Sequence, residues 1–347
     1  MSRRARPGRV TLALLALAAS ACVLAYEIGG HHFALVSIYL DKLVPPPARN
    51  HATYLELFCA ELPDLAMELD AVTQRQHVFN SNEWQWAMFG RCSGPVTKHM
   101  FATQYYLHGL TGDMKKPKGL KTNERLREAV RAMVQRIDGE VASAAPADKL
   151  VRVCARGFVA HLLGDSFAHT QLYAPSTRYA PGTGHWKHNH DPDYLLSREI
   201  LATEFDYSQA WFQEASSVLV KRDAPAMLAT QAKRIIEAYR AEPDHDYAES
   251  KLTEALIDNA PQGWQRFDPP LQKWRPDGVN GIFLQQKCDD QMRKAFPQDG
   301  ERPSCAAVWS YYLGVAIATF KTLEIDPVSN AGYGSCNADG NELKHGE

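Results

Sequence analysis

The sequence predicts an all-α protein, and two observations lead to this fold class. Apolar residues recur at the three- and four-residue intervals of amphipathic helices over most of the chain, whereas the alternating patterns of strands are almost absent. The hydrophobic content of 45% is sufficient for a sizeable core. Helices are expected at residues 31–43, 51–72, 97–110, 122–140, 147–172, 191–201, 204–221, 223–241, 247–258, 279–296 and 303–323.

The N-terminal residues are typical of a secretory signal peptide. Arginines at positions 3, 4, 6 and 9 precede an uncharged run from Val10 to Ala25, which is too short for a comfortable membrane span. Cleavage could occur before Cys22, within a weak lipoprotein-like motif, or before Tyr26. We therefore expect residues 1–25 to be a signal peptide and the protein to be exported, either periplasmic or secreted, with lipid anchoring at Cys22 as the less favoured alternative.

The helix at 122–140 has the clearest pattern. Thr122 is expected as its N-cap, and one face carries Leu126, Val130, Met133, Val134 and Ile137. Near the C-terminus, the uncharged run from Ala306 to Phe320 is about fifteen residues long, which predicts a buried helix and not a transmembrane segment. Two stretches rich in turn-forming or aromatic residues, 173–190 and 260–278, are expected to be irregular.

Charge and cysteine content narrow the functional classes. The formal charge of −2 becomes about −6 without the four N-terminal arginines, so no broad basic surface for duplex nucleic acid is expected. Six cysteines remain once Cys22 is set aside, and an even number in an exported protein predicts as many as three disulfides. The pairing is left open by the sequence, as is the oligomeric state. The six are Cys59, Cys92, Cys154, Cys288, Cys305 and Cys336.

The segment His161-Leu-Leu-Gly-Asp165-Ser-Phe-Ala-His169 is the most informative part of the chain. Side chains four residues apart leave the same face of a helix, with about 6 Å of axial rise between them. His161 and Asp165 are therefore expected to share one metal ion, while His169, about 12 Å from His161 along the axis, would hold a second ion. The alternative is a hydrogen-bonded polar patch on a buried helix.

Further candidate ligands precede this segment. His31 follows Gly30 shortly after Tyr26, Asp64 lies in a helical segment, and His108 lies near the end of another. This ordered set resembles the superfamily of zinc-dependent phospholipases C and single-strand-specific zinc nucleases, which are all-α, secreted and bind three zinc ions. The resemblance covers roughly residues 26–200.

The resemblance implies a role for each matching residue. The amino group and carbonyl of an N-terminal Tyr26 would bind zinc, as would His31, and this favours cleavage before Tyr26. Asp64 would touch metal and orient or deprotonate the attacking water. His108 best matches the next histidine, with His77 and His99 as weaker alternatives.

The later ligands match less closely. His161 and Asp165 fit the family's His-x3-Asp, with the aspartate bridging two zincs, and His169 takes the place of the next histidine. Three residues separate Asp165 from His169, whereas the best-known members have five at this point. No histidine in 185–190 has an acidic residue four positions later, so His185 with Asp193 is the favoured last pair and His190 with Asp193 the alternative.

The resemblance thus implies a hydrolase of phosphate esters that uses up to three Zn²⁺ ions. The ions would activate a water and bind phosphate oxygens. A phospholipid-type substrate is slightly favoured over single-stranded nucleic acid. A single metal-binding domain is expected at 26–347, with a metal-site core at 26–200 and a helical extension at 201–347.

Two other classes remain open from the sequence. One is a non-catalytic exported helical protein that binds metal for stability or for a partner. The other is a serine esterase, because Gly164-Asp165-Ser166-Phe167 resembles the Gly-Asp-Ser start of some esterases. That motif normally follows a strand in an α/β fold.

Overall fold

The computed structural model describes residues 51–63, 102–111, 121–171, 174–179, 214, 216–220 and 284–325. Over these ranges the chain is predominantly helical, which confirms the predicted all-α class. The helices are α3 (His51–Leu62), α6 (Lys121–Val141), α7 (Pro146–Ala168), α12 (Leu284–Ala295) and α13 (Cys305–Thr322), with the short π-helices η4 (Thr103–Leu107) and η6 (Ser216–Val220). A small antiparallel pair, β1 (Thr170–Gln171) and β2 (Ala174–Arg178), follows α7.

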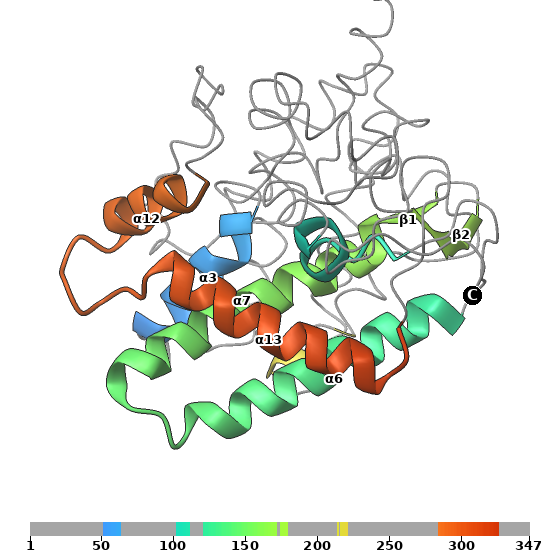
Figure 1. Ribbon diagram of the computed structural model, residues 1–347, viewed down its shortest axis with the longest axis horizontal. Helices are drawn as coiled ribbons and strands as arrows, with labels where there is room; N and C mark the ends of the chain where they lie inside the picture. The colour runs from blue at the N-terminus through green and yellow to red at the C-terminus, as the bar shows by residue number, and fades with distance from the viewer. Residues whose placement is uncertain are drawn as a thin grey trace, which may run out of the picture.

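Helix α7 is the central element of the described fold. It begins at Pro146, a residue whose fixed φ suits the first turn of a helix, and it contacts α3, α6 and α13. Figure 1 shows α7 running between these helices, with α13 crossing it. From Val153 to Ala168 every side chain except that of Arg156 is buried, so both faces of the second half are covered. Chemistry-bearing residues on this half are therefore held in a packed interior.

Helix α6 packs one apolar face against α7, as its sequence predicts. The predicted core residues are at most 1% exposed, whereas the polar residues between them face outward. The helix begins at Lys121, so Thr122 lies within it and the expected N-cap at Thr122 is wrong. The buried face comprises Leu126, Val130, Met133, Val134 and Ile137.

Helices α3 and α7 approach each other unusually closely at Gly157. A Cβ placed on Gly157 would lie 2.3 Å from the carbonyl oxygen of Glu56 and 2.8 Å from the Cβ of Cys59. One turn earlier, Cys154 forms a disulfide with Cys59. Glycine and the disulfide together fix the spacing of α3 and α7 where the second half of α7 begins.

Arg156, next to Gly157, adds polar connections between α7 and its neighbours. Its guanidinium is 13% exposed, pairs with Glu56 of α3 and donates to Asp138 of α6 at 2.8 Å. It also donates to the carbonyl of Leu219 in η6. Because one side chain joins three elements to α7, Arg156 stabilises the packing of the core.

The C-terminal helices belong to the same core as α3, α6 and α7. The Ser304 side chain caps α13 by accepting a hydrogen bond from the Ala307 amide at 3.3 Å. A disulfide between Cys288 and Cys305 joins α12 to α13. Buried residues of α13 continue the core built on α7, and they include Val308, Tyr312, Val315, Ala316 and Phe320.

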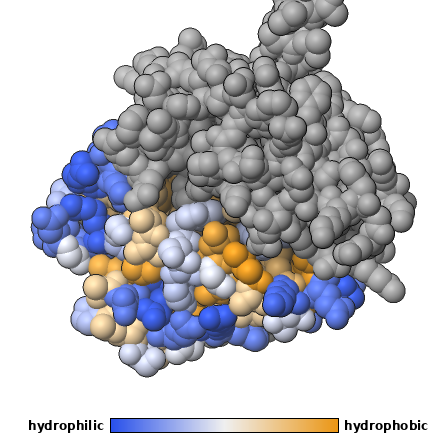
Figure 2. All heavy atoms as spheres, in the orientation of Figure 1, coloured by the Kyte–Doolittle hydropathy of each residue, from blue (hydrophilic) through white to orange (hydrophobic). Residues whose placement is uncertain are grey.

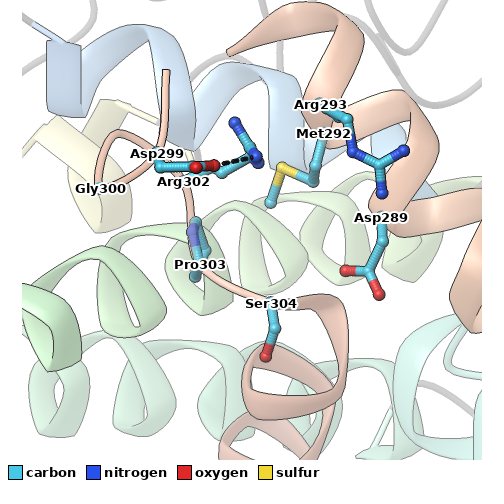
Figure 3. A pocket seen from close by; sticks show the side chains of 8 residues that line it. All are labelled: Asp289, Met292, Arg293, Asp299, Gly300, Arg302, Pro303 and Ser304. Atoms are coloured by element: carbon cyan, nitrogen blue, oxygen red, sulfur yellow. Dashed lines mark hydrogen bonds and ion pairs between the residues drawn. The ribbon is translucent and has the colours of Figure 1, made fainter. Parts of the chain in front are cut away.

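A pocket of about 300 Å³ lies at the turn between α12 and α13. Figure 3 shows two arginines and two aspartates around it, and Arg302 already pairs with Asp299 at 2.6 Å. Its positive and negative side chains balance, and no histidine lines it. The pocket is therefore not a candidate metal site.

The surface and the helices of the described residues both bear on whether this part of the chain crosses a membrane. In Figure 2, hydrophobic and hydrophilic residues are interspersed over the coloured part of this face. Within the ranges given above, no helix is both long and apolar enough to cross a bilayer. The uncharged run of α13 instead buries one face in the core, while Ser310 and Gly314 of the same helix are exposed.

Two predicted elements differ from the structure. In the expected helix 97–110, the described residues form only the π-helix η4, and the chain turns at Gly109 with a φ of 59°. The expected helix 147–172 ends at Ala168, and the stretch predicted as irregular from 173 contains strand β2. Strands β1 and β2 pair across a turn, and segments this short carry no recognisable strand pattern in the sequence. The expected helices 31–43, 191–201, 223–241 and 247–258, and the stretch 260–278, lie outside the described residues.

Candidate metal centre

His161 and Asp165 lie one turn apart on the buried half of α7, as their spacing predicts. Both side chains are fully buried. The Nε2 atom of His161 is 3.1 Å from Oδ2 of Asp165. The two side chains therefore leave the same face of α7 and converge on one point.

His108 reaches that point from a different element. Its Nδ1 lies 2.7 Å from Oδ2 of Asp165 and 3.3 Å from Nε2 of His161. The residue ends η4, where its amide donates to the carbonyl of Thr103 at 3.0 Å across five residues. Short π-helical turns of this kind occur often at functional sites because they redirect one side chain.

Helix α13 and the residues just after it hold η4 in place through two tyrosine hydrogen bonds. The hydroxyl of Tyr312 donates to the carbonyl of Tyr106 at 2.7 Å, and the hydroxyl of Tyr105 donates to the carbonyl of Ile325 at 3.0 Å. Burial, together with the nearby negative charge of Asp165, raises the pKa of Tyr312, so this residue remains a neutral donor. The position of His108 thus depends on residues more than 200 positions away in the chain.

Carbonyl groups fix the orientation of two histidine rings. A carbonyl can only accept, so Nδ1–H of His161 donates to the carbonyl of Ala60 in α3 at 3.0 Å. Likewise Nδ1–H of His169 donates to the carbonyl of His108 at 2.5 Å. Histidine metal ligands are commonly oriented by a bond of this kind through the ring nitrogen that does not bind metal. Nε2 of His161 is the nitrogen that remains to bind an ion.

The three converging atoms fit one metal ion. They are Nδ1 of His108, Nε2 of His161 and Oδ2 of Asp165, and they form a triangle with sides of 2.7, 3.1 and 3.3 Å. The circle through such points has a radius of about 1.8 Å, which is shorter than a zinc–ligand bond of about 2.0–2.1 Å, so the three atoms are close enough together to bind the same ion. Three acceptor atoms this close repel one another unless a proton or a cation lies among them. This buried group could hold a metal ion.

The electrostatic environment keeps Asp165 ionised. Burial alone would raise the pKa of its carboxyl, but the positive charge of protonated His161 and His169 and the hydrogen bonds that His108 and His161 donate hold the pKa well below its usual range. A bound cation would take the place of these protons, because a histidine nitrogen must be deprotonated to bind metal. An ionised carboxylate between two imidazoles is a donor set suited to a divalent cation.

His169 lies at the end of α7, not inside a longer helix as the sequence predicts. Helix α7 ends at Ala168 and His169 is its C-cap, with its amide still donating to the carbonyl of Asp165 at 2.9 Å. Its Nδ1 lies 3.9 Å from Oδ2 of Asp165 and is engaged by the carbonyl of His108. Any metal contact of His169 would therefore use Nε2, and a second ion at this residue stays a prediction.

The other predicted ligands lie outside the described residues. They are Tyr26, His31, Asp64, His185 and Asp193, together with the alternatives His77, His99 and His190. The same holds for the predicted signal peptide and for Cys92 and Cys336. The two described disulfides are typical of proteins from an oxidising compartment, in agreement with export.

The Gly-Asp-Ser stretch singled out by the sequence lies within the buried part of α7. Ser166 lies inside α7, is 2% exposed, and donates to the carbonyl of Leu163 at 2.6 Å. The chain from Pro146 to Ser166 is helical, whereas a strand precedes the Gly-Asp-Ser motif of an esterase.

Sequence reasoning missed Arg178, which is 2% exposed and bonds to the backbone on both sides of the site. No pattern identifies it, because a lone arginine in a polar stretch is ordinarily exposed. No sequence pattern predicts that the carbonyl of Ala60 orients His161 either.

Two imidazoles and a carboxylate in a buried cluster can bind a divalent ion, which can in turn act as a Lewis acid or lower the pKa of a bound water. No protein-family model, curated protein or solved structure matches the chain, so the site is interpreted from its own residues.

Proposed function

We propose that this protein is an exported, metal-dependent phosphoric ester hydrolase whose ion is held by His108, His161 and Asp165. The observation that carries the proposal is the convergence of these three buried side chains, with ligand atoms 2.7–3.3 Å apart. They come from two separate elements, η4 and α7, and the ring of His161 is oriented by its hydrogen bond to the carbonyl of Ala60. Such a constellation is expensive to bury without a cation, which is why it indicates function and not only packing.

Zinc is the metal that this donor set favours. Imidazole nitrogens suit zinc, copper, iron and nickel, whereas all-oxygen sites suit magnesium and calcium. Catalytic zinc sites typically have three protein ligands and leave one position for water, whose pKa falls to about 7. Two histidines and one carboxylate are one of the ligand sets used in this way.

The phosphate-ester reaction is proposed from the resemblance to zinc phospholipases C and zinc nucleases. In that scheme Tyr26, His31, His169, His185 and Asp193 supply further ligands, for up to three ions. Asp64 would orient or deprotonate the attacking water. A phospholipid-type diester is the favoured substrate class, since the acidic net charge does not suit a polyanion.

Metal removal tests this function directly. We expect the mature protein to carry at least one equivalent of zinc by elemental analysis and to hydrolyse bis(p-nitrophenyl) phosphate or phosphatidylcholine. Chelation should lower the rate by at least about 100-fold, because the ion supplies both the nucleophile and the Lewis acid. Added Zn²⁺ should restore the rate.

Three outcomes separate the competing classes. Bound zinc with no turnover of phosphodiesters, phosphomonoesters, phospholipid or single-stranded oligonucleotides would instead identify a non-catalytic metal-binding protein. Activity that survives chelation and disappears in Ser166→Ala would identify a serine esterase. Under the proposed function, Ser166→Ala retains metal and activity, because the Ser166 hydroxyl bonds to a backbone carbonyl within α7.

A further inference from the structure

Arg178 is a buried arginine placed beside the metal ligands by the hairpin after α7. It is the last residue of β2 and pairs with Thr170 of β1, so the chain folds back against the end of α7. The next residue continues this contact, since the amide of Tyr179 donates to the carbonyl of His169 at 3.0 Å. The side chain of Arg178 is 2% exposed. Its guanidinium therefore lies inside the protein.

The guanidinium joins the two segments that carry the ligands. On one side, Nε and Nη2 donate to the carbonyl of Gly109, the residue after His108, at 2.9 and 2.5 Å. On the other side, Nη1 donates to the carbonyl of Ser166 at 2.8 Å, and Nη2 lies 3.4 Å from the carbonyl of Asp165. One rigid planar group thus connects the backbone next to His108 with the backbone of Asp165.

The surroundings of the Arg178 guanidinium favour a positive charge and leave little space beside it. Ser166 and Asp165 lie in the last turn of α7, where the helix dipole favours positive charge. A Cβ placed on Gly109 would lie 3.0 Å from Nη2 of Arg178 and 2.9 Å from a methyl group of Leu126. The guanidinium thus lies directly against the Gly109 turn, which has no room for a side chain at this position.

We propose that Arg178 is a positioning residue of the metal centre, which sets the spacing of His108 relative to Asp165 and thereby the affinity for the ion. It acts through its hydrogen bonds to the two backbone segments that carry His108 and Asp165. The inference rests on the proposed binding of metal by His108, His161 and Asp165. Lysine cannot replace this group, because its donors all leave one nitrogen and do not reproduce the planar fork of arginine.

The test compares Arg178→Lys and Arg178→Met with the wild-type protein, using Zn²⁺ in competition with a chromophoric chelator and Co²⁺ as a spectroscopic probe. We expect both variants to bind Zn²⁺ about 10–100-fold more weakly, the effect typical of residues that orient metal ligands. The visible bands of bound Co²⁺ should shift or weaken, because the ligand geometry changes. The methionine variant keeps the packed stem without a buried charge, and so remains informative if the lysine variant does not fold.

Arg156→Lys is the matched control. Arg156 is also a largely buried arginine that bonds to several elements, but its partners are Glu56, Asp138 and the carbonyl of Leu219. This variant should lower the unfolding temperature while leaving the Zn²⁺ affinity and the Co²⁺ spectrum unchanged. A purely structural Arg178 would give the same result as Arg156.

The outcomes distinguish this inference from the proposed function. If the wild type binds neither Zn²⁺ nor Co²⁺, the metal site is wrong and the inference is lost with it. If the wild type binds metal but hydrolyses no phosphate ester, the enzymatic proposal fails while the role of Arg178 is still measured. If the wild type binds metal and both Arg178 variants keep its affinity and spectrum, the inference alone is overturned.

Discussion

Replacing Asp165 with asparagine should remove at least one equivalent of bound zinc and raise the dissociation constant by more than about 100-fold, the upper range for residues that merely orient a ligand. Oδ2 of Asp165 is the atom shared by His108 and His161, at 2.7 and 3.1 Å. An asparagine of the same shape supplies a neutral oxygen or an amide donor in its place. Elemental analysis and Zn²⁺ titration measure the loss directly.

Thermal unfolding provides a second measurement of the same change. A ligand that binds only the folded state adds about 2.7 kcal/mol of stability at a concentration 100 times its dissociation constant. Zinc should therefore raise the unfolding temperature of the wild type by several degrees and that of Asp165→Asn by much less. An asparagine variant that keeps its zinc and its zinc-dependent stabilisation would show that the ion is held elsewhere.

Asp148→Asn is a suitable control for this experiment. Asp148 lies on the same helix, its side chain is 64% exposed, and its nearest ion-pair partner is Arg152 at 3.8 Å. Exposed pairs of this kind contribute about 0–1 kcal/mol. The control should therefore retain wild-type zinc content and nearly wild-type stability.

Replacing Gly157 with alanine should destabilise the protein by about 3 kcal/mol or more, at the upper end of overpacking effects. The added methyl would meet the Glu56 carbonyl oxygen at 2.3 Å and the Ala60 amide nitrogen at 2.9 Å, both of which are backbone atoms. The helices would have to separate, and the disulfide between Cys59 and Cys154 resists separation. Thermal unfolding should show a decrease of roughly 5–10 °C.

The same substitution should also weaken metal binding. The carbonyl of Ala60 orients His161 at 3.0 Å, so displacement of α3 moves the acceptor that fixes this ring. Gly139→Ala is the matched control, because Gly139 lies near the end of α6, is exposed, and has nothing within 4 Å of its added Cβ. It should stabilise the protein by about 0.5–1 kcal/mol through helix propensity. Equal stability of the two alanine variants would contradict the close packing of α3 on α7.

Periodicity predicted the helices well and their ends poorly. The apolar face of α6 and the burial of α7 follow from residues spaced three and four apart, which is a local property of the chain. The end of α7 at Ala168 was missed because the competing hairpin depends on pairing Thr170 with Arg178 across a turn. Likewise, η4 replaced part of an expected helix through contacts with Tyr312 and Ile325 in a distant segment.

By itself, the sequence determined the all-α class, the convergence of His161 with Asp165, and the choice of His108 as a candidate third ligand. The first two depend on helical spacing, which acts over a few residues and is readable in any helix. Only the tertiary structure brought His108 to that pair, ended α7 just before His169, and placed Arg178 between the two ligand-bearing segments. These features depend on contacts between residues far apart in the chain, which arise only when the packed core fixes the helices relative to one another.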